Sequence, residues 1–194
     1  MEPTIYKPSI YKSAGIYKAE AGGGVSDCVE IAGKYYKTKK INNTIWITEN
    51  LSYIDDNIYV GDTLTSLITA LPTFNFYNFA AVVYLTNNAN NIFNGWRVAN
   101  IDDYQYLMDN YQWSDLLTSR FGGNNSSELN FECSGIYNGT NFDDQNDYGE
   151  YWIANDSYSN PADCFQIEKV NQNITIGHNY MRENYRPVRL CKDA

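Results

Sequence analysis

The chain has 194 residues, 43% of them hydrophobic and 15% aromatic, so it has enough length and apolar bulk to close a buried core. Its formal net charge of −9 disfavours nucleic acid as a partner, because an acidic surface repels phosphate. No apolar run approaches the roughly 20 residues of a transmembrane helix, and the N-terminus lacks the basic and apolar segments of a signal peptide. We therefore expect neither membrane insertion nor export by that route.

Residues 1–24 form a repetitive arm that does not fit a compact core. The tripeptide Ile-Tyr-Lys recurs in it, Pro3 and Pro8 oppose a helix, and residues 22–24 are three glycines that make a flexible joint. Repeated apolar pairs need a receiving surface, so we expect the arm to dock on a neighbouring subunit or a larger assembly; a disordered tail is the alternative. The candidate assembly residues are Ile5, Tyr6, Ile10, Tyr11, Ile16 and Tyr17.

The globular domain is expected to span residues 25–194 and to begin with short strands. Residues 29–31, 34–41 and 44–48 are strand-like, with tight turns between them at Gly33 and at Asn42 and Asn43. Further along, residues 77–85 predict a short buried helix, and the Asn-rich residues 87–91 predict a loop.

The strongest helix signal in the chain begins at Asn100. Asn is a good N-cap, and Asp102 and Asp103 place carboxylates in the first turn, where the helix dipole favours negative charge. Apolar side chains then recur at helical spacing, which predicts a buried face made of Ile101, Tyr104, Leu107, Met108 and Tyr111. Residues 122–130 predict a flexible loop.

The last third of the chain alternates short strands with polar segments. The predicted strands cover residues 151–153, 164–167, 174–176 and 187–191. The segments between them are rich in Asn, Asp, Ser and Tyr, which is typical of a contact surface because Tyr gives rigid area and Asn or Ser gives adaptable hydrogen bonding. The candidate ligand-binding residues are Asn155, Asp156, Ser157, Tyr158, Asn160, Asn171, Asn173, His178, Asn179, Tyr180 and Asn184.

Catalytic, metal and disulfide chemistry has little support in the sequence. The acidic cluster Asp143, Asp144, Asn146 and Asp147 gives a weak Ca²⁺ loop at most, because Asn155 stands where an EF-hand-like alignment needs a bidentate Glu. His178 is the single His and has no recognisable nucleophile as its partner. The four cysteines lack CxxC spacing; two disulfides are one possibility, and four buried thiols are favoured. We therefore expect a binding protein without a cofactor, not an enzyme.

Five blocks of the chain, in the right order, resemble the Fibrobacter succinogenes major paralogous domain of Bacteroidetes and their phages. The resemblance spans about residues 28–194, and one departure is that Ile92 stands where the family has a Cys. The blocks are residues 36–53 (with Tyr36-Lys37-Thr38 and Trp46), 76–81, 92–100 (with Gly95-Trp96), 151–157 and 187–193 (with Val188-Arg189).

This resemblance implies an α+β, C-type-lectin-like domain: small twisted antiparallel sheets, two helices and a long loop-rich C-terminal half, here with an extended N-terminal arm. It also implies a phage virion protein, a tail or head fibre or spike, that binds a glycan or protein on the host cell surface. We expect a homo-oligomer, with a trimer favoured, assembled in the host cytoplasm and attached to other virion proteins through its arm. The alternatives are a structural decoration or adaptor protein of the virion and a bacterial cell-surface protein of the same family.

Overall fold

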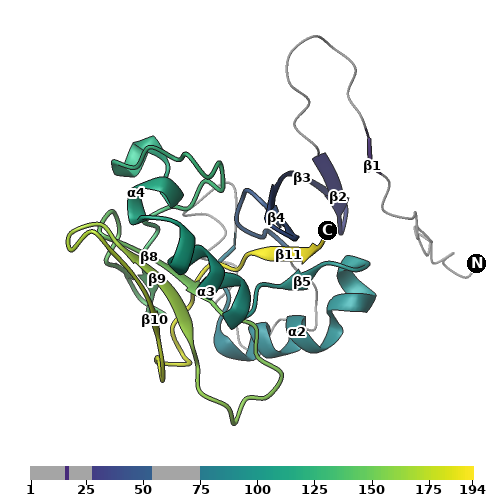
Figure 1. Ribbon diagram of the computed structural model, residues 1–194. Helices are drawn as coiled ribbons and strands as arrows, with labels where there is room; N and C mark the ends of the chain where they lie inside the picture. The colour runs from purple at the N-terminus through teal and green to yellow at the C-terminus, as the bar shows by residue number, and fades with distance from the viewer. Residues whose placement is uncertain (1–15, 18–27, 54–74) are drawn as a thin grey trace, which may run out of the picture.

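The computed structural model describes residues 16–17, 28–53 and 75–194, and these residues form a mixed α+β fold with small antiparallel sheets and few helices (Figure 1). The largest sheet has six strands, and all of its pairings are antiparallel. In sheet order they are β1 (Ile16–Tyr17), β2 (Cys28–Ile31), β3 (Lys34–Ile41), β4 (Thr44–Ile47), β11 (Leu190–Asp193) and β5 (Arg97–Val98).

Strand β11 lies between β4 and β5, so it joins the first strands of the domain to the middle of the chain (Figure 1). Cys191 pairs with Trp46 on one side and with Arg97 on the other. The observed strand β11 lies closer to the C-terminus than the strand predicted at residues 187–191. The reason is that residues 187–189 make other contacts. Among these, the Arg189 guanidinium donates to the carbonyls of Leu129 at 2.9 Å and Asn130 at 2.7 Å.

A second sheet has three antiparallel strands, and it carries most of the predicted contact residues at its two ends. In sheet order its strands are β10 (Asn173–Gly177), β9 (Cys164–Glu168) and β8 (Tyr148–Trp152). The sequence predicted all three, with β8 placed three residues too late. A small two-stranded sheet pairs β6 (Ile136–Tyr137) with β7 (Phe142–Asp143).

Helix α2 (Phe79–Phe93) is longer than predicted and includes the expected loop at residues 87–91, so that prediction was wrong. The reason is tertiary packing: Ala89 and Phe93 extend the buried face that begins with Val82 and Leu85, and this burial outweighs the weak helix propensity of the asparagines. The Asn78 side chain caps the N-terminus by accepting from the Ala81 N–H, and Asn94 ends the helix with φ 48°.

Helix α3 (Ile101–Asn110) confirms the predicted start at Asn100. The Asn100 side chain accepts from the Asp103 N–H, and the Asp103 carboxylate accepts from the Asn100 N–H, which makes a reciprocal capping box. Of the predicted face, Tyr104 and Leu107 are buried, whereas Ile101 remains 42% exposed. A short helix α4 (Trp113–Leu116) and a 3₁₀ turn at Ser119–Phe121 follow, and neither was predicted.

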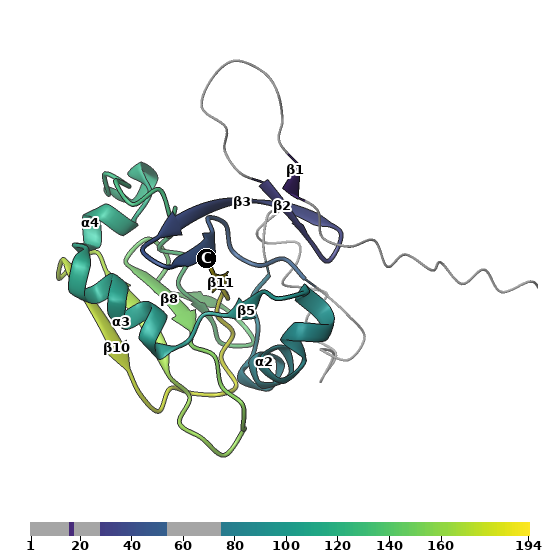
Figure 2. The same cartoon turned by 45° about the vertical axis from the view of Figure 1, so that its right-hand side comes forward.

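The buried side chains form two main clusters, one on each side of the molecule. The first lies between α2 and the six-stranded sheet, where Trp96, Val188 and Leu190 meet the buried face of the helix. The second lies between α3 and the three-stranded sheet, where the Tyr104 ring stacks on Phe165 with 4.4 Å between ring centroids. Figure 2 shows the two helices against these different sheets. Among the helices of the described residues, none combines the length and apolarity needed to span a bilayer.

Candidate functional site

Two of the predicted contact segments leave the same end of the three-stranded sheet. Strand β8 ends at Trp152, β9 begins at Cys164, and β10 ends at Gly177, and the register pairs Cys164 with both Trp152 and Gly177. The chain segments that follow β8 and β10 therefore start at the same end of the sheet, one on each side of Cys164. We call residues 155–160 and 178–184 together the loop surface.

Residues 178–184 contact Asn160 and the two residues Ala162 and Asp163 that precede β9. The Tyr180 N–H donates to the Ala162 carbonyl at 2.9 Å, and the Arg182 guanidinium donates to the Asn160 carbonyl at 2.8 Å. His178 Nδ1 lies 2.9 Å from an Asp163 carboxylate oxygen. Segments separated by β9 and β10 in the sequence thus make one continuous surface.

An aromatic and cationic group lies at the centre of the loop surface. The Arg182 guanidinium sits 4.9 Å from the centroid of the Tyr158 ring and 5.5 Å from that of Phe79, at the start of α2. Tyr158 is 48% exposed, and Met181 beside Arg182 is 70% exposed. Tyr158 was predicted as a contact residue from the sequence, whereas Met181 was not, because it does not belong to the polar composition that marks the segment.

The side chains of two predicted contact asparagines form hydrogen bonds within the loop itself. Asn155 Nδ2 donates to the Pro161 carbonyl at 2.9 Å, and Asn160 Nδ2 donates to the Asp156 carboxylate at 2.9 Å. Helix α2 adds two more links, since Asn87 Nδ2 donates to the Asp156 carbonyl and the Thr86 hydroxyl accepts from the Asn155 N–H. The backbone of residues 155–160 is therefore fixed from inside and from α2.

Tyr180 differs from the other tyrosine of the surface because it is half-buried. Its ring lies 4.8 Å from the Arg186 guanidinium, and its hydroxyl donates to Gln166 Oε1 at 3.4 Å. Burial raises the Tyr180 pKa to about 12. Tyr180 thus belongs mainly to the support of the surface, whereas Tyr158 belongs to its exposed part.

A buried ion pair lies directly beneath this end of the sheet. Arg186 Nε donates to Glu150 Oε2 at 2.7 Å, and both side chains are nearly inaccessible. The Arg186 guanidinium also stacks over Trp152 at 4.5 Å from the ring centroid, and Gln166 donates to the second oxygen of Glu150. Glu150, Arg186 and Gln166 thus form one connected network beneath the loop surface.

The structure places the remaining contact residues apart from this centre. Asn171 and Asn173 lie at the β9–β10 turn, which is the opposite end of the sheet. His178 and Asn179 are exposed on the loop surface, Ser157 bonds Ser159 at 2.8 Å, and Asn184 is half-buried in a turn where its N–H donates to the Met181 carbonyl. The predicted set therefore divides into two surfaces.

The acidic cluster proposed as a weak Ca²⁺ loop is a tight turn between β7 and β8. The N–H groups of Asp147 and Tyr148 both donate to the Asp144 carbonyl, and the Asp143 carboxylate accepts from Asn138 at 2.6 Å. Asp144 and Asn146 have φ values of 58° and 72°. Within residues 28–53 and 75–194, no group of three or more His, Cys, Asp or Glu side chains is placed to hold a metal ion.

The four cysteines are free thiols, and three of them are buried while Cys28 is half-buried. Burial raises the pKa of Cys133 to about 11 and raises the pKa values of Cys164 and Cys191 above their ordinary value. These three sulfurs are therefore held as thiols, the unreactive form. The disulfide alternative is not what the structure contains.

The assembly arm lies largely outside the described residues, which is where Ile5, Tyr6, Ile10 and Tyr11 fall. Ile16 and Tyr17 form β1, which pairs with β2 of the same chain through Ile16 with Val29 and Tyr17 with Cys28. The last repeat of the arm thus extends the main sheet by backbone pairing. Docking on a neighbouring subunit stays a prediction.

Comparison of the chain with models of known protein families, with curated proteins and with solved structures gave no match.

Proposed function

We propose that the chain is a phage virion protein that presents a C-type-lectin-like domain to a ligand on the host cell surface. The observation that carries this proposal is the loop surface. Its two polar segments are separated in sequence but joined by hydrogen bonds, and they lie over the buried ion pair of Glu150 and Arg186. A ligand-contact surface needs such a combination, since exposed side chains bind best when the backbone beneath them is already ordered.

The arrangement of the elements supports a C-type-lectin-like domain. Strand β11 closes the main sheet beside β4, helices α2 and α3 flank the sheets, and the C-terminal half consists of short strands and long loops. These features agree with what the resemblance implies. The same resemblance supplies the virion role, the trimer and the attachment of residues 1–24 to other virion proteins.

Exposed residues at the centre of the loop surface are expected to make the ligand contact. The Tyr158→Ser variant removes a ring that is 48% exposed and lies beside Arg182, so adsorption of the purified protein to host cells should fall by roughly tenfold or more. Its thermal midpoint should change little, because Tyr158 is about half exposed and does not belong to the buried core. Tyr106→Ser, at an exposed position on α3, is the matched control and should adsorb like the parent.

The competing role is a structural decoration or adaptor protein of the virion. Firm incorporation into particles without any adsorption to cells would favour that role and would count against receptor binding. A bacterial surface protein is the third reading, and genes for virion components beside the coding sequence would argue against it.

The arm is expected to drive assembly without being needed for the fold of the domain. Deleting residues 2–21 removes β1, the edge strand that pairs with β2, and the other described strands of the sheet keep their partners. We expect the truncated protein to be a folded monomer, whereas the parent chain is a trimer, by size-exclusion chromatography with light scattering and circular dichroism. An unfolded truncated protein would show that the arm belongs to the core.

A further inference from the structure

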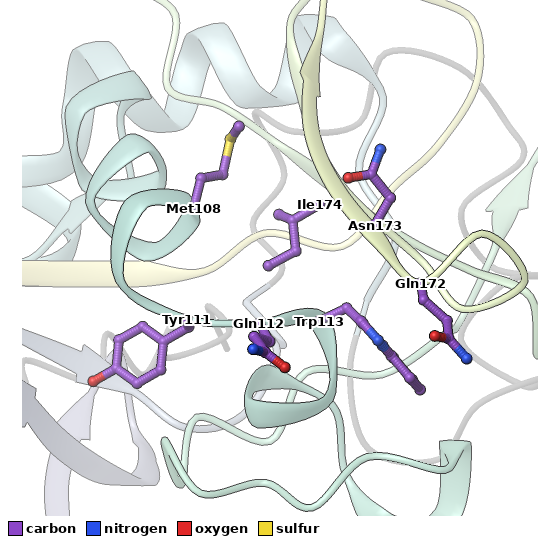
Figure 3. A pocket seen from close by; sticks show the side chains of 7 residues that line it. All are labelled: Met108, Tyr111, Gln112, Trp113, Gln172, Asn173 and Ile174. Carbon is purple, nitrogen blue, oxygen red and sulfur yellow. The ribbon is translucent and has the colours of Figure 1, made fainter.

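A separate pocket lies at the opposite end of the three-stranded sheet from the loop surface. It is formed where α3 passes into α4 and faces the start of β10, and its volume is about 340 Å³, within the size range of small-ligand sites (Figure 3). Its lining residues are Met108, Tyr111, Gln112, Trp113, Gln172, Asn173 and Ile174.

The lining of this pocket combines apolar side chains with neutral amides. Figure 3 shows Met108 and Ile174 extending towards the same space, and Trp113 beside Gln172. Trp113 is half-buried, so it is anchored in the second core cluster while part of its ring stays accessible. No Asp, Glu, Lys or Arg belongs to the lining.

The β9–β10 turn offers one amide to a ligand in the pocket. Within the part of the chain that the structure describes, the side chains of Gln172 and Asn173 have no hydrogen-bond partner, whereas the neighbouring Asn171 donates to Glu168 at 2.7 Å. Gln172 has φ 54°, a conformation that the β9–β10 turn imposes on it, and this places its side chain beside Trp113. The turn therefore presents the Gln172 amide beside Trp113, whereas the Asn173 side chain lies on the opposite face of the sheet from Ile174, because successive side chains of a strand alternate between faces.

We propose that this pocket binds a neutral sugar unit that carries a methyl-bearing substituent, such as an N-acetylated hexose. The C–H face of a sugar ring is apolar and packs on an indole, hydroxyl groups bond to amides as both donors and acceptors, and Met108 with Ile174 receives the methyl group. An anionic sugar does not fit, because the lining offers no cation and the protein carries a net charge of −9.

This inference goes beyond the proposed function, because the pocket and the loop surface are separate. They lie at opposite ends of β10, and four steps along a strand cover about 13 Å. Sugar binding in the pocket does not depend on whether the chain belongs to a virion. Substitutions can remove binding at one site and leave the other intact.

Tryptophan fluorescence tests the proposal, because Trp113 is the accessible indole. The chain has four Trp residues, and Trp46, Trp96 and Trp152 are each no more than 2% exposed. Acrylamide should therefore quench mainly Trp113 in the full-length protein. We expect millimolar N-acetylglucosamine to protect this fluorescence from quenching, glucose to protect it less, and N-acetylneuraminic acid to give no protection.

Variants locate the bound sugar. Gln172→Ala should weaken the apparent affinity for N-acetylglucosamine by roughly three- to tenfold, since it removes a hydrogen-bonding group of the pocket. Asn171→Ala, in the same turn but outside the lining, should bind like the parent. Tyr158→Ser should also bind like the parent, which separates this site from the loop surface.

Three results would overturn the proposal. They are absence of protection by any neutral sugar, equal protection by N-acetylneuraminic acid, and protection that survives in Gln172→Ala but is lost in Tyr158→Ser. The last result would place the sugar on the loop surface instead, and so would support the proposed function while rejecting the pocket.

Discussion

Arg186 shows at the scale of one residue how the protein stabilises polar loops from below. Its guanidinium is buried between Trp152 and Tyr180, and it is paired with Glu150 at 2.7 Å. A buried ion pair adds little net stability compared with apolar side chains, but losing one partner is costly because the other charge stays buried. The pair therefore fixes one arrangement of the residues beneath the loop surface.

Removing the partner of Arg186 is expected to destabilise the protein strongly. Glu150→Ala should lower the free energy of unfolding by about 3–5 kcal/mol, because the buried guanidinium loses its counterion and Gln166 loses its acceptor. Urea denaturation measures this change. Glu128→Ala removes an exposed pair with Lys39 and is the control, with an expected loss below about 1 kcal/mol. Equal losses in both variants would contradict this account of Arg186.

At the scale of the element, the sequence predicts a helix best where its local capping signal agrees with the spacing of its buried residues. Helix α3 is such a case, since its N-cap and its apolar spacing both start at Asn100. Helix α2 is the opposite case, because asparagines that favour turns lie within a helix whose burial is decided by the sheet it packs on. The capping residue Asn94, with φ 48°, was not recognised as the helix end.

The two-part arrangement of the contact residues could not be predicted from composition. The polar segments look alike in sequence, and only the pairing of β8, β9 and β10 decides that residues 155–160 and 178–184 meet while Asn171 and Asn173 lie far away. The burial of Tyr180 has the same origin, since its partners Gln166 and Arg186 come from other elements. Non-local contacts carry no local sequence signal.

The capping box of α3 gives a prediction at this scale. Asn100→Ala should lower the free energy of unfolding by about 1 kcal/mol, because the Asp103 N–H loses its side-chain acceptor. Asn90→Ala, at an exposed position inside α2, is the comparison; Ala is the better helix former, so its stability should be equal or slightly higher. Thermal unfolding followed by circular dichroism distinguishes the two variants. An Asn100→Ala variant as stable as the parent protein would show that the cap adds no stability.

At the scale of the whole molecule, the buried tyrosines make the fold sensitive to alkali. Burial raises the pKa values of Tyr151 and Tyr180 to about 12, from an ordinary value of 10.0, and it also raises those of Tyr77 and Tyr104. Above pH 10 the unfolded chain loses these protons first, so the unfolded state gains stability relative to the folded one.

We therefore expect the free energy of unfolding to begin to fall near pH 9, where the three buried thiols would ionise in the unfolded chain, and to fall further as the pH rises from 10 towards 12. Urea midpoints across this range measure the slope, and tyrosinate absorbance shows whether ionisation accompanies unfolding. Tyr180→Phe keeps the ring against Arg186 and removes one titrating group, so its slope should be shallower. A parent protein whose stability stays constant across this range would contradict the role of burial.

The position of β11 has a consequence for how the protein folds during its synthesis. Strands β4 and β5 can pair with their shared neighbour β11 after the ribosome has translated Leu190–Asp193. Until then the backbone groups of Trp46 and Arg97 that face β11 have no strand to pair with, and such long-range pairing is slow. A chain cut short before β11 is therefore expected to be removed by proteases as a nascent, incompletely folded product, so that full-length subunits are the ones available for any later assembly.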